Sequence, residues 1–273
     1  MTSHTTSART ARTARTARTA RTARTARTAR TAIAALGAGL LLAGCSLSGG
    51  AFADDAYKTA AADATVTEAV TAVKVTGARS GSIEVTPGAG PGVTVHRTVH
   101  YRGDTVPATG QKVTGGVLTF SNSCSGNCYI DYRLEVPAAA TVELESSSGA
   151  IAVTGVAGAE VEADSGAVTA DRISGPLKVR TSSGEIAATG LTGPSAEIRS
   201  SSGNTRLDFT KAPSTVLAET TSGEVTLKVP QAPYRIKVST DSGDRDVTLA
   251  DDASASSRIS VETSSGDIHI SAV

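Results

Sequence analysis

The sequence predicts an all-β protein whose main domain is a parallel β-solenoid. Three observations support this prediction: a Ser-Gly dipeptide recurs every 17 to 23 residues, apolar and polar residues alternate on both sides of it, and aromatic residues are scarce. The recurring dipeptides end at glycines Gly149, Gly166, Gly184, Gly203, Gly223, Gly243 and Gly266.

Apolar residues keep a fixed distance from each repeated glycine. Five positions before the glycines stand Leu144, Val161, Val179, Ile198, Ala218, Val238 and Val261. The neighbouring positions are mostly polar, as at Glu162, Arg180 and Arg199. Because a strand points alternate residues to opposite faces, we expect the first set inside and the second in water. Each unit is therefore predicted to be strand, turn and strand, with glycine supplying the backbone freedom of a tight corner.

A unit of 17 to 23 residues is too small to bury its own apolar face. Successive units are expected to stack in order about 4.8 Å apart, each coil on the one before. The narrow interior of such a stack fits a chain with 39% hydrophobic residues, 3% aromatic residues and no tryptophan. A seven-stranded antiparallel sandwich is the alternative, but it predicts irregular spacing and usually an aromatic centre. We favour the solenoid.

Residues 1–44 are predicted to be a secretory signal. Eight copies of Ala-Arg-Thr fill residues 8–31, and a short apolar stretch follows at residues 32–44. The tetrapeptide Leu-Ala-Gly-Cys that ends at Cys45 resembles a bacterial lipobox. The resemblance implies that the Cys45 sulfur receives a diacylglyceryl group and that Cys45 becomes the mature N-terminus. Ordinary secretion and a retained membrane anchor are the alternatives.

The charge balance changes when the signal is removed. The whole chain has 26 basic and 26 acidic residues, but the part after residue 44 has 18 basic and 26 acidic residues, a formal charge of −8. An acidic surface argues against nucleic acid as a partner. The predicted location is the extracytoplasmic face of a bacterial cell membrane, with the lipid anchor as the membrane contact.

Residues 45–64 are rich in Ser, Gly, Ala and Asp and are predicted to be a flexible tether. The solenoid domain is predicted to span residues 65–273. Its first coil is expected around Gly81, which follows a serine as the later repeat glycines do. Longer, less regular strands are expected at the N-terminal end of the stack, at residues 93–101, 113–120 and 129–136.

Cys124 and Cys128 lie in a polar Cys-Ser-Gly-Asn-Cys segment. Outside the cytoplasm, with Cys45 lipidated, they are the remaining pair, and we predict a disulfide between them. Free thiols and a functional role, such as metal binding or redox chemistry, are the alternatives. The loop is short, so the bond is expected to fix a local turn rather than to stabilise the whole domain.

The run Tyr-Arg-Leu-Glu-Val-Pro at residues 132–137 is followed by Val-Glu-Leu at 142–144 and then by repeated Ser-Ser-Gly-x-Ile. This arrangement resembles the bacterial putative-adhesin family of β-strand-repeat surface domains, whose function is unknown. The resemblance covers roughly residues 66–273. It implies a parallel β-solenoid exposed at the cell envelope, and it transfers no catalytic residues.

Two groups of residues are candidates for chemistry. His96 and His100 are four residues apart on a predicted strand, a separation of about 13 Å, which is too far for a shared metal ion. No serine-hydrolase elbow, P-loop, dinucleotide fingerprint or zinc spacing occurs in the sequence.

The second group is an acidic column near the C-terminus, formed by Glu224, Asp244, Asp246, Asp267 and His269. If the coils stack in order, Asp244 lies beside Asp267 and Asp246 beside His269, with Glu224 on the coil before. Paired carboxylates at this separation suit calcium coordination or glycosidic-bond chemistry. A solvated sheet face is the interpretation that we favour, and these five residues are weak metal-site candidates.

The sequence therefore predicts a lipid-anchored, extracytoplasmic binding or scaffolding module, similar to an adhesin, rather than an enzyme. No catalytic residue or cofactor is assigned, and calcium is the one ion considered. The expected partners are a cell-wall polymer or another surface protein. The alternative is a carbohydrate-active or calcium-dependent cell-envelope protein that uses the C-terminal acidic column.

Overall fold

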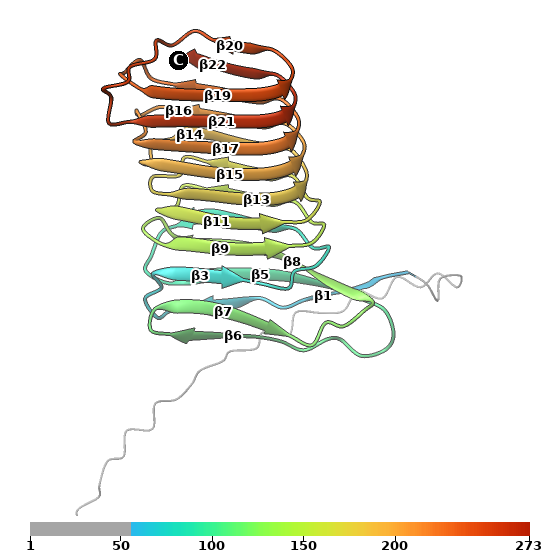
Figure 1. The fold of residues 1–273 in the computed structure, drawn as a ribbon. Helices are drawn as coiled ribbons and strands as arrows, with labels where there is room; N and C mark the ends of the chain where they lie inside the picture. The colour runs from blue at the N-terminus through green and yellow to red at the C-terminus, as the bar shows by residue number, and fades with distance from the viewer. Residues whose placement is uncertain (1–55) are drawn as a thin grey trace, which may run out of the picture. The chain divides into compact units, whose positions relative to one another are not determined.

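Residues 56–273 are those that the structure, a computed structural model, describes. They form 22 strands in two sheets, with no helix in this range (Figure 1). Sheet A has the strand order β1-β5-β8-β4-β10-β12-β14-β16-β18-β22-β20, with β2 paired to β5, and sheet B has the order β19-β21-β17-β15-β13-β11-β9-β3-β7-β6.

Most of the domain consists of coils, each with one strand in sheet B, a Ser-Gly corner and one strand in sheet A. The strands of sheet B are β3 (Ala72–Val75), β9 (Thr141–Ser146), β11 (Gly158–Ala163), β13 (Leu177–Ser183), β15 (Ser195–Ser202), β17 (Thr215–Ser222), β19 (Arg235–Ser242) and β21 (Arg258–Ser265). Their partners in sheet A are β4 (Ile83–Gly88), β10 (Ile151–Thr154), β12 (Val168–Asp171), β14 (Ile186–Leu191), β16 (Thr205–Phe209), β18 (Val225–Val229), β20 (Arg245–Val247) and β22 (Ile268–Ala272). All neighbouring coil strands pair in parallel, which confirms the predicted all-β parallel solenoid.

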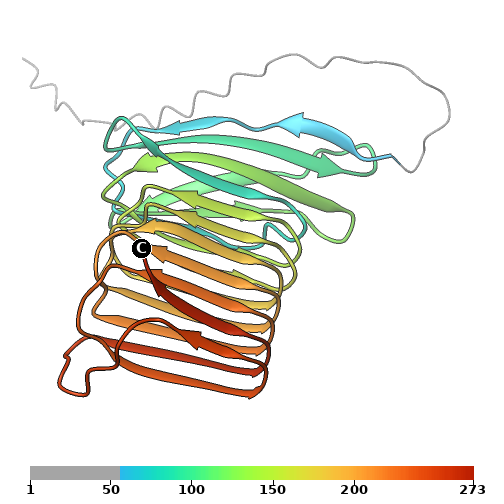
Figure 2. The ribbon, with the colours of Figure 1, turned by 90° about the horizontal axis from the view of Figure 1, so that it is seen from above.

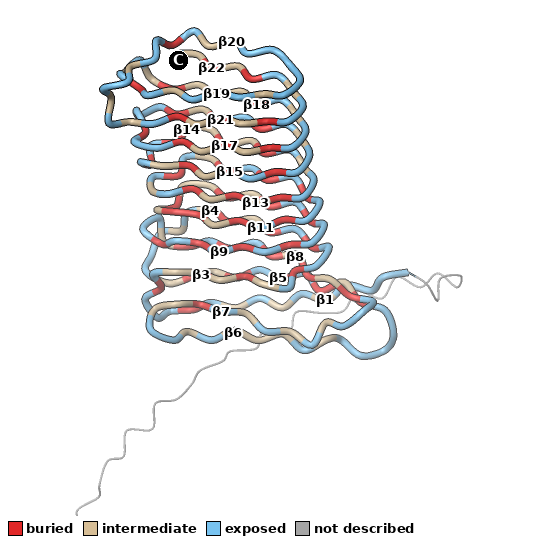
Figure 3. The backbone as a smooth tube through the Cα atoms, in the orientation of Figure 1, coloured by how far each residue is buried: buried red, intermediate tan, exposed pale blue. Residues whose placement is uncertain are grey.

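The predicted register is confirmed in sheet B. Val161 pairs with Leu144 on one side and with Val179 on the other, and Val179 in turn pairs with Ile198. All four side chains are almost completely buried between the sheets. The polar neighbours of these residues face water, so that buried and exposed stretches alternate along each strand (Figure 3).

The corner glycines are required mainly for space. A Cβ added to Gly149 would overlap the carbonyl oxygen of Gly81, and one added to Gly166 would overlap that of Gly149. The same overlap with the neighbouring coil recurs at Gly184, Gly203, Gly223, Gly266 and Gly243, where φ also lies between 116° and 147°. Gly149 and Gly166 have no positive φ. Backbone freedom, the role expected from the sequence, is therefore only part of the reason for glycine, because close stacking excludes a side chain at every corner.

The coils do not stack in sequence order at the C-terminal end. The coil of β21 and β22 lies between the coil of β17 and β18 and the coil of β19 and β20, as Figure 1 shows. The expectation that each coil lies on the one before it is therefore wrong here. We call the coil of β21 and β22 the inserted coil.

The side chains explain this order. Arg245 occupies the register position at which Ile268 and Val225 point inward. Stacked in order, β20 would place Arg245 between two apolar coils, and burying an unpaired charge is costly. At the end of the stack Arg245 is exposed. Ile268 and Ile270 of the inserted coil are fully buried instead.

The N-terminal end is an antiparallel addition to the stack. It comprises β1 (Lys58–Ala61), β2 (Ala64–Val66), β5 (Val93–Tyr101), β6 (Thr109–Thr114), β7 (Val117–Asn122) and β8 (Cys128–Pro137). β5 pairs antiparallel with β8, β1 and β2, and β6 and β7 form a hairpin. Figure 2 shows these blue and green strands at one end of the stack and the orange and red coils at the other.

Two details of this end differ from the sequence prediction. Residues 58–61, expected in the tether, form a strand along β5. Three of these four side chains are exposed, so the strand is held by backbone pairing and has no apolar pattern to reveal it. A single strand is expected at residues 113–120, but Gly115 and Gly116 interrupt it. They form the turn of the β6–β7 hairpin. The first coil is found as predicted, because β3 and β4 pair with β9 and β10 around Gly81.

A buried arginine joins the two sheets at this end. Arg97 lies on β5 of sheet A, and only 4% of its surface is exposed. Its Nε donates a hydrogen bond to the carbonyl oxygen of Ala62 (2.8 Å), and its Nη2 donates one to Oε1 of Gln111 on β6 (2.8 Å). Burial lowers the pKa of Arg97. This link could not be predicted from the sequence, because Arg97 is a single charged residue among the alternating residues of a strand.

Candidate functional site: the outer face of sheet B

The outer face of sheet B carries two columns of charged residues that run across the strands. One column, four positions before the corner glycines, contains Glu145, Glu162, Arg180, Arg199, Glu219 and Glu262 in spatial order. The other contains Glu143, Glu160, Lys178 and Glu197, six positions before the glycines, together with Lys74, which pairs in register with Glu143. Neighbouring members lie on adjacent hydrogen-bonded strands, about 4.8 Å apart along the backbone.

Ion pairs connect the two columns. Arg199 contacts Glu197 at 2.9 Å and Glu219 at 3.0 Å. Arg180 has looser contacts, at 3.5 Å to Glu162 and 3.8 Å to Glu197. Lys74 pairs with Glu143, and Lys178 pairs with Glu160. Exposed pairs of this kind contribute little to stability, so their main effect is to hold the charged groups in a fixed pattern.

Two of these interactions shift a pKa toward the charged form. The hydrogen bond from Arg199 to Glu219 raises the pKa of Arg199, and the hydrogen bond from Lys178 lowers the pKa of Glu160. An ion pair favours the charged form of both partners. The face therefore presents positive and negative groups together at neutral pH.

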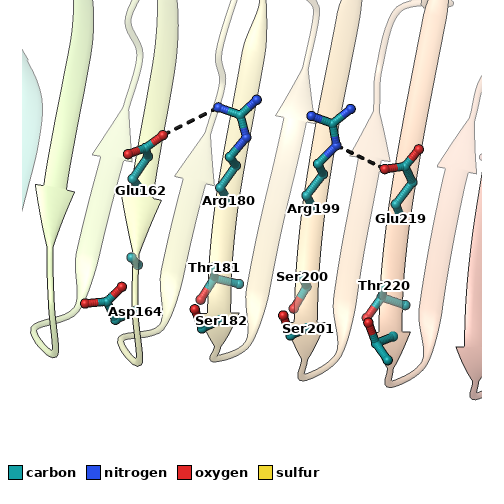
Figure 4. Close-up of a pocket in the computed structure, with 12 residues that line it drawn as sticks. Glu162, Asp164, Arg180, Thr181, Ser182, Arg199, Ser200, Ser201, Glu219 and Thr220 are labelled. Carbon is teal, nitrogen blue, oxygen red and sulfur yellow. Dashed lines mark hydrogen bonds and ion pairs between the residues drawn. The ribbon is translucent and has the colours of Figure 1, made fainter.

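A groove of about 490 Å³ runs over β11, β13, β15 and β17 beside the Ser-Gly corners. One side of this groove is the charged column, in which Arg180 and Arg199 lie next to each other between Glu162 and Glu219 (Figure 4). The other side is a line of exposed polar residues next to the corners, Asp164, Ser182, Ser201 and Thr221. We call this feature the sheet B groove.

Three residues, Thr181, Ser200 and Thr220, form the floor of the groove between these two sides. The hydroxyls of Thr181, Ser200 and Thr220 donate hydrogen bonds to the carbonyl oxygens two residues later, at 3.2, 3.1 and 3.4 Å. These three residues point inward and are mostly buried. Their bonds fix the corners, whereas the exposed hydroxyls of the rim can both donate to and accept from a bound molecule.

The acidic column predicted from the sequence lies elsewhere, on the outer face of sheet A. Because of the inserted coil, Asp267 stands between Glu224 and Asp244, whereas sequence order had placed Asp244 next to Glu224. An oxygen of Asp267 accepts a hydrogen bond from the backbone N–H of Asp244 (2.8 Å). His269 lies 3.9 Å from Glu224 and 3.8 Å from Asp246. Within residues 56–273, no three His, Cys, Asp or Glu side chains are arranged to hold a metal ion.

The two histidines on β5 have separate partners. Nδ1 of His96 lies 3.4 Å from Asp63, and Nε2 of His100 lies 2.8 Å from Asp131. The ring of His100 also stacks on Tyr129, with ring centres 4.3 Å apart. Both histidines are on a strand, as predicted, and they do not meet at a common site.

Cys124 and Cys128 are joined by a disulfide, at the start of β8. Cys45, the predicted lipidation site, lies outside the described residues, and the predicted signal and most of the tether lie there with it. None of the described residues belongs to a helix that is long and apolar enough to span a membrane.

The sequence identified three charged residues of the sheet B groove as outward-facing, but it did not identify the groove as a site. Glu162, Arg180 and Arg199 were expected in water, and they are. Their grouping depends on which coils are neighbours and on the depth of the surface beside the corner. A signal was present in the spacing, because Arg180 and Arg199 hold the same position before successive repeat glycines.

Comparison with known proteins identifies the family. The model of the Toastrack DUF4097 family matches residues 106–271, more than half of the chain. The chain belongs to this family. The match begins before β6 and reaches into β22, so the Toastrack region includes every coil from β9 onward and the sheet B groove.

Three solved structures are similar to this chain, and the first of them shows the same fold. A protein described as a putative adhesin from Bacteroides fragilis NCTC 9343 matches this Toastrack chain with a TM-score of 0.50 and 13% identity, over 78% of this chain and 97% of that one. A putative cell adhesion protein from Clostridium sporogenes ATCC 15579 matches with a TM-score of 0.39 and 13% identity, over 80% of this chain and 100% of that one. A putative adhesin from Parabacteroides distasonis ATCC 8503 matches with a TM-score of 0.39 and 16% identity, over 79% and 98%. The search of curated proteins found no match.

Proposed function

We propose that this Toastrack protein is a binding or scaffolding module on the extracytoplasmic face of a bacterial membrane, anchored by lipid at Cys45. The basic segment, the short apolar stretch and the lipobox-like tetrapeptide before Cys45 support the anchor. Two acyl chains would hold the protein stably, whereas one chain alone gives marginal binding.

The sheet B groove is the observation that carries the proposal. It extends over four coils, and its walls repeat with the spacing of the strands. A surface of this kind fits an extended polymer that lies across the strands, and solenoids commonly use such repetitive faces for binding. The fold shared with a protein described as a putative adhesin agrees with this role.

The chemistry of the groove favours binding over catalysis. Its lining consists of Glu, Asp, Arg, Ser, Thr and Ala side chains, with no histidine or cysteine among them. The charged groups hold one another in ion pairs, and the floor hydroxyls are bonded to the backbone. A catalytic serine is most often activated by a neighbouring histidine, and no histidine lines the groove.

A sedimentation assay tests the proposal. The mature protein, purified in detergent, is mixed with isolated cell wall, and the bound fraction is measured with and without calcium. We expect Arg180→Gln with Arg199→Gln to reduce the bound fraction at least about tenfold, since two charged contacts would be lost. The matched control is Arg206→Gln on the outer face of sheet A, where the arginine pairs with Asp208.

The control variant should bind as the wild type does. Equal binding by the groove variant and the control variant, with both folded by circular dichroism, would show that the sheet B groove is not the binding surface.

A further inference from the structure

The order of charges along the sheet B groove is specific. From β11 to β17 the charged column reads Glu162, Arg180, Arg199, Glu219, which is negative, positive, positive, negative. Asp164 adds a second carboxylate at the β11 end, on the opposite rim. A ligand that complements this order carries a cation at each end and an anion between them.

The spacing of the charges selects the class of ligand. Strands are about 4.8 Å apart, so the point between Arg180 and Arg199 lies about 7 Å from the strand of Glu162 and about 7 Å from that of Glu219. In an extended peptide, side chains on one face are two residues apart, which is also about 7 Å. A peptide with the pattern cation-x-anion-x-cation on one face would therefore place each charge opposite its complement.

The central arginines can receive the anion. The contacts of Arg180 with Glu162, Glu160 and Glu197 measure 3.5 to 3.9 Å, longer than a charge-assisted hydrogen bond. Arg180 can therefore turn to a carboxylate on a ligand without breaking a short bond. Arg199 lies beside it, and the two arginine side chains extend along their strands next to each other (Figure 4).

The opposite rim can hold the peptide backbone. An extended peptide has N–H and C=O groups that need partners when they leave water. Ser182, Ser201 and Thr221 offer exposed hydroxyls along the groove at the strand spacing, and hydroxyls both donate and accept. The charged column would then bind the side chains of the peptide, while the hydroxyls of the opposite rim would form hydrogen bonds with its main chain.

We propose that the sheet B groove binds an extended peptide segment in which a carboxylate is flanked, two residues away on each side, by amino groups. This inference rests on the proposed function, since it names the ligand of the same groove. It identifies the partner as a surface protein that presents such a segment, recognised by the spacing of its three charges.

Two peptides of identical composition test the order of charges. Fluorescently labelled, blocked Lys-Ala-Asp-Ala-Lys carries the proposed order, and Lys-Ala-Lys-Ala-Asp carries the same charges in another order. Fluorescence anisotropy with the mature protein should give at least about fivefold tighter binding for the first peptide, from two correctly placed ion pairs. The preference should weaken at 0.5 M salt, because the groups are exposed.

Variants assign the preference to the groove. Arg180→Gln with Arg199→Gln should abolish it, whereas Arg206→Gln on sheet A should leave it unchanged. Equal binding of the two peptides by the wild type would overturn the inference. If the groove variant also loses cell-wall binding while the peptides show no preference, the proposed function stands and the peptide ligand is wrong. Competition of wall binding by a neutral glycan, with no peptide preference, would likewise overturn the peptide assignment.

Discussion

Replacing Gly166 by alanine tests why glycine occupies the corners. Gly166 has no positive φ, so alanine costs nothing in backbone conformation there. If the corner had space, the substitution would stabilise the protein by about 0.4 to 1 kcal/mol, because alanine restricts the unfolded chain. The structure leaves no space, since a Cβ at this position would lie less than 3.0 Å from the carbonyl oxygen of Gly149.

The magnitude follows from what must move. Two hydrogen bonds between coils precede Gly166, from the N–H of Asp164 to the oxygen of Ser146 (3.2 Å) and from the N–H of Ser165 to the oxygen of Ser147 (2.9 Å). Separating the coils enough to admit a Cβ would weaken both, at about 0.5 to 1.5 kcal/mol each. Overpacking adds about 1 to 3 kcal/mol. We expect Gly166→Ala to destabilise the protein by about 3 kcal/mol.

Urea unfolding followed by circular dichroism measures the change, with the slope against urea compared between variants. Gly115→Ala is the matched control, since Gly115 has a φ of 59° and no atom within 4 Å of an added Cβ. The free energy of unfolding of Gly115→Ala should fall by about 1 to 2 kcal/mol, the cost of placing alanine in a left-handed conformation. If Gly166→Ala proves as stable as the wild type or more stable, the steric explanation of the repeat is wrong.

Three further predictions address the anchor, the register and the acidic column. Cys45→Ser should abolish acyl labelling and release the protein from the membrane fraction, and unchanged retention would refute the lipid anchor. Val179→Asp should destabilise the domain by about 4 kcal/mol or more in urea unfolding, because it buries an unpaired charge, whereas Arg180→Asp should cost less than about 1 kcal/mol; similar losses would contradict the register. Calcium at low millimolar concentration should raise the melting temperature no more than a monovalent salt of matched ionic strength. A calcium-specific rise that disappears in Asp244→Asn with Asp267→Asn would show a cation site.

The register of the coils could be predicted because the repeat provides an internal reference. Once the glycines are aligned, the period of 2 decides that Val179 points inward and Arg180 outward. The N-terminal strand at residues 58–61 could not be found in this way, since it depends on the free edge of β5 and not on an apolar face. Arg97 was missed for a related reason, because its partners are backbone and amide oxygens contributed by distant segments.

The coil order and the groove show what a linear pattern omits. Sequence spacing cannot distinguish stacking in order from insertion of the last coil. β21 pairs with β17 and with β19 in the same register, at seven positions each. The evidence was a single residue, Arg245, at a position where the other coils have Ile, Val or Thr. The groove likewise depends on lateral neighbours, since Arg180 and Arg199 are 19 residues apart in the chain but adjacent in the sheet.

The inserted coil limits how this domain can lengthen in evolution. Tandem duplication extends an ordinary solenoid at its terminus, where the last coil offers a free edge to the new one. Here both edges of β21 and β22 are occupied, by β17 and β18 on one side and by β19 and β20 on the other. A coil duplicated after residue 272 would find no edge beside its parent. A duplicated coil can lie directly beside its parent before β19, so longer relatives of this architecture should differ in the number of middle coils and keep the same closing arrangement of four strands.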